Sequence, residues 1–125
     1  MAFEGKTIVL VDDNKNACQL LDMVLSKCGF NVMQAHDGQS GLELIRKQRP
    51  EFAIIDIGLP VIDGIEVVRS VKEDGSEATF CVALTGNVTE GGKREALEAG
   101  FDAHFLKPIK PSVLASFILE QSAND

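Results

Sequence analysis

Five short apolar runs alternate along this chain with five segments of helical periodicity, and this alternation limits the fold more than any other feature. The runs, rich in β-branched residues, cover residues 7–11, 31–35, 52–57, 79–84 and 103–106. Each run predicts a strand. Strands separated by helices pair in parallel through right-handed crossovers, and the helices then cover both faces of the sheet. We therefore predict an α/β fold with one doubly wound, five-stranded parallel sheet.

The segments between the runs carry apolar residues three and four positions apart, which is the periodicity of an amphipathic helix. In the first segment this stripe comprises Ala17, Leu20, Leu21, Val24, Leu25 and Cys28. Gly29 follows it, where glycine commonly ends a helix. A second helix is predicted over residues 38–48. The remaining three have shorter stripes: Ile65, Val68 and Val71; Ala96 and Leu97; and Val113, Leu114, Phe117 and Ile118.

Length and composition favour one domain over residues 1–125, with a core at about residues 6–121. A chain of 125 residues that is 45% hydrophobic can bury one core. Its formal net charge of −7 disfavours direct contact with the phosphate backbone of nucleic acids. The chain has no run of about 18 apolar residues, so we expect no membrane span. Cys18, Cys28 and Cys81 lie in apolar patterns and are expected to be reduced core thiols of a cytoplasmic protein.

One carboxylate interrupts the third run, and other polar residues follow the neighbouring runs. Asp56 lies among apolar residues, where an ionisable group without a partner is costly. Asp12 and Asp13 follow the first run, Thr85 the fourth and Lys107 the fifth. Because parallel strands share one direction, the residues after each strand gather at one edge of the sheet, where open α/β folds bind ligands. The sequence therefore predicts one polar site at this edge.

The residue types at this predicted site suit phosphoryl transfer to an aspartate. Three carboxylates placed together repel one another unless a cation neutralises them. Oxygen ligands favour a hard ion, Mg²⁺ or Mn²⁺. The carboxylate of Asp56 can attack phosphorus and form an acyl phosphate. The ion, the Lys107 ammonium and the Thr85 hydroxyl can together hold the equatorial oxygens of the transferring group.

Each of these residues also has an ordinary structural interpretation. Asp12 and Asp13 could cap the first helix, Thr85 could end a strand, and Lys107 could be a surface lysine. Their joint position at four strand ends favours one site. A phosphohydrolase with an aspartyl-phosphate intermediate is disfavoured, because an Asp-x-Asp-x-Thr signature does not follow the first run. Glycine-rich nucleotide-binding motifs are also missing there. We therefore do not expect an enzyme that turns over external substrates.

The motifs around these residues resemble those of the receiver domain of two-component response regulators, over roughly residues 6–121. They are Val9-Leu10-Val11-Asp12-Asp13-Asn14, Asp56-Ile57-Gly58-Leu59-Pro60 with Asp63-Gly64, Ala83-Leu84-Thr85-Gly86, and Leu106-Lys107-Pro108. The resemblance implies a flavodoxin-like (βα)₅ domain with strand order 2-1-3-4-5. The alternative is a receiver-like protein-binding module that phosphorylation no longer regulates.

The resemblance also implies roles for individual residues. Asp13 and Asp56 would bind Mg²⁺ directly with the backbone carbonyl of Gly58, and Asp12 would act largely through water. Asp56 would accept the phosphoryl group from a phosphohistidine of a histidine kinase or a histidine phosphotransfer domain. The Lys107–Pro108 peptide would be cis and would direct the lysine into the pocket.

The resemblance also implies a conformational switch. The Thr85 hydroxyl would turn toward the phosphoryl group, and Phe105, two positions before the lysine, would move into the vacated space. The surface formed by the fourth helix, fifth strand and fifth helix would then change shape and bind a downstream protein.

Overall fold

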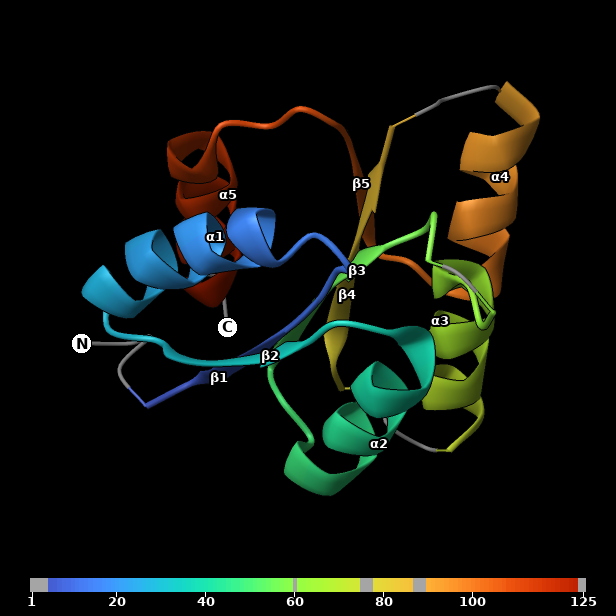
Figure 1. Ribbon diagram of the computed structural model, residues 1–125, viewed down its shortest axis with the longest axis horizontal. Helices are drawn as coiled ribbons and strands as arrows, with labels where there is room; N and C mark the ends of the chain where they lie inside the picture. Colours follow the sequence, from blue (N-terminus) through green and yellow to red (C-terminus); the bar gives the residue numbers. More distant parts are fainter. Residues whose placement is uncertain (1–4, 60, 75–77, 87–89, 124–125) are drawn as a thin grey trace.

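The computed structural model describes residues 5–59, 61–74, 78–86 and 90–123, in which strands and helices alternate as predicted (Figure 1). The elements are β1 (Thr7–Val11), α1 (Lys15–Lys27), β2 (Asn31–Ala35), α2 (Gly38–Gln48), β3 (Phe52–Asp56), α3 (Gly64–Glu73), β4 (Phe80–Thr85), α4 (Glu90–Ala99), β5 (Ala103–Leu106) and α5 (Pro111–Ala123). All strand pairs are parallel, in the order β2-β1-β3-β4-β5. The predicted fold class and strand order are confirmed.

Three boundaries of two strands, β3 and β4, differ from the prediction by one residue. β3 ends at Asp56 rather than Ile57, because the chain turns there and the Ile57 carbonyl accepts a hydrogen bond from the Gly64 amide. β4 begins at Phe80 and includes Thr85, which pairs with Leu106 of β5. Thr85 is thus the last residue of the strand and does not lie beyond it.

Helices cover both faces of the sheet and enclose two apolar cores. Helices α1 and α5 lie on one face, and α2, α3 and α4 lie on the other (Figure 1). Alternate residues of β1 belong to different cores: Ile8 and Leu10 pack toward α1 and α5, and Val9 and Val11 pack toward α2 and α3. Burial of each such side chain contributes roughly 1.5–3 kcal/mol. The central strand β3 is buried along its whole length, so Asp56 sits at the end of an apolar strand.

Short polar side chains begin three of the helices. Asn14, Asp37 and Asp63 accept hydrogen bonds from the backbone amides of Ala17, Ser40 and Glu66, respectively. Each cap satisfies an amide that has no partner within its helix. Gly29 follows α1 with a φ of 102°, so glycine ends this helix as predicted.

Five phenylalanine rings form a continuous row on the α1 and α5 face of the sheet. Successive ring centroids lie 6.2 Å apart for Phe30 and Phe52, 5.8 Å for Phe52 and Phe80, 6.0 Å for Phe80 and Phe117, and 5.0 Å for Phe117 and Phe105. Tilted and edge-to-face contacts at these distances stabilise aromatic pairs beyond their buried area. Phe105 is therefore part of this apolar row.

The three cysteines differ in how deeply they are buried. Cys18, Cys28 and Cys81 are free thiols, although Cys28 is only half-buried. Burial raises the pKa of Cys18 to about 11 and that of Cys81 to about 12, so both thiols stay protonated at neutral pH.

Within the described ranges, no helix is long and apolar enough to cross a membrane.

The loop between β3 and α3 contains a strained residue. Val61 has a φ of 67°, and its side chain is 100% exposed. Left-handed conformation costs an L-residue roughly 1–2 kcal/mol, and the cost is largest for β-branched side chains.

We expect Val61→Gly to raise the free energy of unfolding by about 1 kcal/mol, because glycine tolerates this φ and no buried contact is lost. Urea unfolding would measure the change. Val61→Ala is the matched control, since alanine keeps most of the strain and should change the stability by less than half as much. Equal stabilities of the glycine variant and the unmodified protein would contradict the strain at this residue.

Candidate functional site

The predicted site lies at the carboxyl-terminal edge of the sheet. Asp12 and Asp13 directly follow β1, Asp56 ends β3, Thr85 ends β4, and Lys107 directly follows β5. These four strands are consecutive in the sheet, in the order β1-β3-β4-β5. The fold therefore brings the carboxylates and the lysine together as predicted.

Three carboxylates converge at this edge. Asp12, Asp13 and Asp56 each offer one oxygen, and these oxygens all lie within 4.8 Å of one another. Asp12 and Asp56 are buried, with 4% and 7% of their surfaces exposed, whereas Asp13 is exposed. The pocket thus holds two buried acids beside one that faces solvent.

Backbone amides orient the two buried carboxylates. The Asn14 amide donates a 2.9 Å hydrogen bond to Asp12 Oδ1, and the Gly58 amide donates a 3.0 Å hydrogen bond to Asp56 Oδ1. The side chain of Asn14 meanwhile caps α1 through the Ala17 amide. Each buried acid therefore has one oxygen held by the backbone and the other available to a cation.

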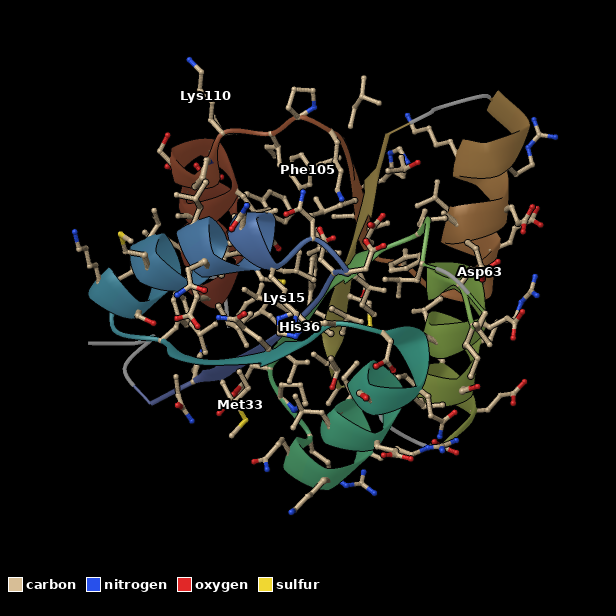
Figure 2. All side chains as sticks on the ribbon, in the orientation of Figure 1. Lys15, Met33, His36, Asp63, Phe105 and Lys110 are labelled. Atoms are coloured by element: carbon tan, nitrogen blue, oxygen red, sulfur yellow. The ribbon has the colours of Figure 1, made fainter. Side chains whose placement is uncertain are left out.

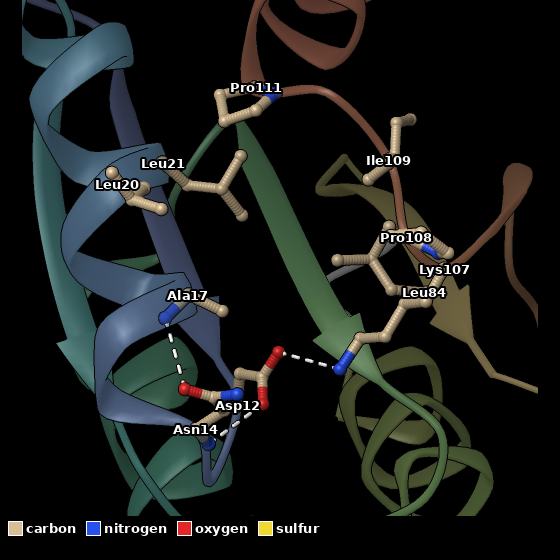
Figure 3. A pocket seen from close by; sticks show the side chains of 10 residues that line it. All are labelled: Asp12, Asn14, Ala17, Leu20, Leu21, Leu84, Lys107, Pro108, Ile109 and Pro111. Atoms are coloured by element: carbon tan, nitrogen blue, oxygen red, sulfur yellow. Dashed lines mark hydrogen bonds and ion pairs between the residues drawn. The ribbon is translucent and has the colours of Figure 1, made fainter.

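Lys107 supplies the positive charge of the pocket. Its Nζ lies 2.9 Å from Asp12 Oδ2 and 3.0 Å from Asp56 Oδ2 (Figure 3 shows the contact with Asp12). The Lys107–Pro108 peptide is cis, as in the family that the sequence resembles. Burial alone lowers the pKa of Lys107, but hydrogen bonds and attraction from both carboxylates raise it above its ordinary value of 10.5.

This raised pKa fixes the pH range in which the ion pairs contribute to stability. The folded-state pKa of Lys107 exceeds the unfolded-state value, so the contribution is fully present from neutral pH up to pH 10.5. It is lost only as the pH rises through the folded-state pKa. Lys107 is therefore charged and paired at neutral pH.

The donor set fits a hard divalent cation. Carboxylate oxygens from three residues lie within coordinating reach of one ion. The ammonium group between two of them indicates that the pocket attracts positive charge. Mg²⁺ retains several waters and binds few protein ligands, so a partly exposed site of this kind suits it.

Thr85 lies beside the pocket at the end of β4. The residue is 8% exposed, and its carbonyl accepts a 2.7 Å hydrogen bond from the Lys107 amide. The end of β4 thus holds the backbone from which the lysine side chain projects. Pro60, the last residue of the predicted Asp56 motif, is outside the described residues.

The structure corrects the predicted contact between Thr85 and Phe105. In the β4–β5 register, Leu84 pairs with Phe105, whereas Thr85 pairs with Leu106. Successive residues of a strand point to opposite faces, so Thr85 and Phe105 lie on opposite faces of the sheet. Phe105 packs against Phe117 between β5 and α5 (Figure 2). Phe105 therefore cannot move directly into space that the Thr85 hydroxyl vacates.

Two other β5 residues share the face of Thr85. The register pairs His104 with Ala83 and Leu106 with Thr85. Burial, followed by the charge of Lys93 on α4, lowers the pKa of His104. The side chains on this face of β5 are thus His104 and Leu106, neither of which was predicted to take part in the switch.

An apolar groove adjoins the pocket and was not predicted. Its cavity volume is ≈ 240 Å³, and it lies between α1 and the loop from β5 to α5 (Figure 3). Apolar side chains line most of it, including Leu20, Leu84 and Ile109, with Asp12 and Lys107 at one end. The lining residues are distant in sequence and share no motif, so no sequence signal could have identified the groove.

Known proteins share both the sequence pattern and this architecture. Residues 8–119 match the family described as response regulator receiver domain. The chain is 35% identical over 101 residues to the response regulator MprA of Mycobacterium ulcerans, covering 81% of this chain and 43% of the relative. It is 32% identical to the alkaline phosphatase synthesis transcriptional regulatory protein PhoP of Bacillus subtilis, covering 86% of this chain and 44% of the relative.

A solved structure agrees with this assignment. The receiver domain protein (CheY-like) of Methanospirillum hungatei superimposes with a TM-score of 0.90 at 26% sequence identity, covering 97% of this chain and 96% of that one. The chain therefore belongs to the response regulator receiver domain family, the receiver domains of two-component systems. It spans about half the length of the curated relatives it matches.

Proposed function

We propose that this domain accepts a phosphoryl group on Asp56 and thereby changes the surface it presents to a partner. The observation that carries the proposal is the convergence of Asp12, Asp13 and Asp56 within 4.8 Å, with Lys107 bridging two of them. A carboxylate in this position can attack phosphorus. An oxygen of Asp56 would bond to the phosphorus while the bond to the donor nitrogen breaks, and the electron pair would stay on that nitrogen.

Mg²⁺ is the proposed cofactor, with Mn²⁺ as a substitute. The carboxylates of Asp13 and Asp56 and the backbone carbonyl of Gly58 would hold the ion, and Asp12 would act through water. When bound, the ion neutralises charge on the phosphoryl oxygens. The Gly58 amide supports this role for Asp56, because its hydrogen bond to Oδ1 fixes the orientation of the carboxylate.

Lys107 and Thr85 are the proposed contacts to the phosphoryl group. The ammonium already lies 3.0 Å from Asp56 Oδ2, so it is within reach of an oxygen attached there. Such preorganised charge stabilises a developing phosphoryl transition state more effectively than solvent does. The Thr85 hydroxyl would donate a second hydrogen bond from the end of β4.

The proposed donor is a phosphohistidine of a histidine kinase or histidine phosphotransfer domain, and the proposed output surface lies on α4, β5 and α5. Three large apolar residues support that surface: Leu97, Leu106 and Val113 are 48%, 55% and 51% exposed. Signal transfer from Thr85 to this surface would involve His104 and Leu106, which share its face. We also propose that residues 6–121 constitute one receiver domain, and that an output function of the longer relatives, where present, resides in other residues.

A small-molecule phosphodonor tests the proposal without a cognate kinase. We expect incubation with acetyl phosphate and Mg²⁺ to add one phosphoryl group to the intact protein, as measured by mass spectrometry. EDTA should prevent the addition, and Mn²⁺ should restore it. Equal modification without any divalent ion would remove the metal from the mechanism. Absence of modification under all conditions, with beryllofluoride also failing to bind, would favour a protein-binding module independent of phosphorylation.

A further inference from the structure

The loop that connects Asp56 to α3 is held from two sides by glycines. Gly38, the first residue of α2, is buried against Ile62 of this loop. A Cβ at residue 38 would overlap the Ile62 carbonyl oxygen and lie 3.0 Å from the Ile62 Cβ. Because the obstructing atom belongs to the backbone, a side chain here would displace the loop itself.

The second contact lies at the other end of the loop. A Cβ at Gly64 would lie 2.6 Å from the Asp56 carbonyl oxygen and 2.7 Å from the Ile57 Cα. The Gly64 amide also donates a 3.1 Å hydrogen bond to the Ile57 carbonyl. The start of α3 therefore packs directly on the backbone that carries Asp56.

The strain at Val61 indicates that these neighbours impose the loop conformation. A valine with φ of 67° gains nothing from burial, since its side chain is fully exposed. Such a conformation persists only when the surrounding structure determines it. Leu59 is buried and Ile62 packs on the core, so both sides of the strained residue are anchored.

From this packing we infer that Gly38 is a positioning residue for the metal site, acting through the loop that bears Gly58. The inference rests on the proposed function, in which the Gly58 carbonyl is a metal ligand. The first turn of α2 is itself fixed, because Asp37 accepts a 2.7 Å hydrogen bond from the Ser40 amide. A rigid helix end thus presses on Ile62 and determines where Gly58 lies relative to Asp56.

The test compares Mg²⁺ affinity in two glycine variants under conditions where both are folded. Gly38→Ala should raise the dissociation constant for Mg²⁺ by about tenfold, as expected when a residue supporting a metal ligand is altered. Isothermal titration calorimetry would measure it. Gly100→Ala is the matched control: its Cβ would lie 2.8 Å from Lys72 Cγ, and its φ is +124°, but it lies at the opposite edge of the sheet. It should lose stability and keep its Mg²⁺ affinity.

The outcomes separate this inference from the function on which it rests. Equal Mg²⁺ affinities of Gly38→Ala and the unmodified protein would overturn the inference alone. An unmodified protein that does not bind Mg²⁺ would overturn the proposed metal site. Equal losses of affinity in Gly38→Ala and Gly100→Ala would also overturn the inference, because general destabilisation would then explain both.

If Gly38→Ala does not fold, a measurement on the unmodified chain tests the positioning role of Gly38. Mg²⁺ should slow hydrogen exchange of the Ser40 and Gly41 amides, which bond to Asp37 in the first turn of α2. Exchange of the Arg49 amide at the far end of this helix should be unchanged. Unchanged exchange in the first turn on saturation with Mg²⁺ would overturn the inference.

Discussion

Asp56→Asn should abolish phosphoryl uptake from acetyl phosphate completely, whereas the unmodified domain should gain one phosphoryl group. Asparagine has nearly the same shape, and its side-chain oxygen can still accept the hydrogen bond from the Gly58 amide. Its amide is not a nucleophile toward phosphorus, so an acyl phosphate cannot form. Because the fold is preserved, loss of modification would be attributable to the chemistry of this one group. The intact mass of each protein after incubation with Mg²⁺ and acetyl phosphate would show whether the phosphoryl group has been added.

Asp63→Asn is the matched control for this variant. Asp63 belongs to the loop after Asp56, and its side chain caps α3 through the Glu66 amide. Asparagine is as good a cap as aspartate, so the helix should be unaffected. This variant should be phosphorylated to the same extent as the unmodified protein. Full modification of Asp56→Asn would show that another residue is the acceptor.

Lys107→Met should change metal binding and phosphoryl transfer in opposite directions. The substitution removes a positive charge that lies 2.9 Å and 3.0 Å from two carboxylates of the pocket. Without this competing charge, Mg²⁺ should bind at least about tenfold more tightly, a difference of about 1.4 kcal/mol. Phosphorylation at saturating Mg²⁺ should nevertheless be slower by about 100-fold or more, because one preorganised charge on the phosphoryl group is lost.

Lys110→Met is the appropriate control for the lysine. Lys110 lies in the same connection between β5 and α5, but its side chain is exposed and points away from the site (Figure 2). The same change of charge there should leave both Mg²⁺ affinity and phosphorylation rate nearly unchanged. Titration calorimetry and timed mass spectra would supply the two quantities. Weaker Mg²⁺ binding by Lys107→Met would contradict the view that lysine and metal compete for the same oxygens.

The sheet and most of its polar edge could be predicted because their signals are local. Each strand is a short β-branched run, and parallel pairing places the residues after the strands together without further information. Asp56 was prominent because it interrupts an apolar strand. The convergence of Asp12, Asp13 and Lys107 follows from topology alone, and the structure places them as expected.

Features that depend on register or on tertiary approach could not be predicted in this way. The face on which Phe105 lies depends on the pairing of β4 with β5, and a difference of one residue reverses it. Leu97 belongs to a correctly identified helix, but Ala96 is the buried residue and Leu97 is half-exposed. The contact between Gly38 and Ile62 joins the start of α2 to the loop after β3, and no shared sequence pattern links the two segments.

Lys107 also has a consequence for folding, because its charge replaces that of a divalent ion in the pocket. Since the Lys107 ammonium already pairs with both buried acids, we expect the domain to fold in a medium depleted of magnesium. It differs in this respect from small metalloproteins that unfold when a chelator removes their ion. In the proposed function, magnesium would therefore bind to a domain that is already folded. If the proposed function holds, a chelator should therefore stop phosphoryl uptake without unfolding the domain.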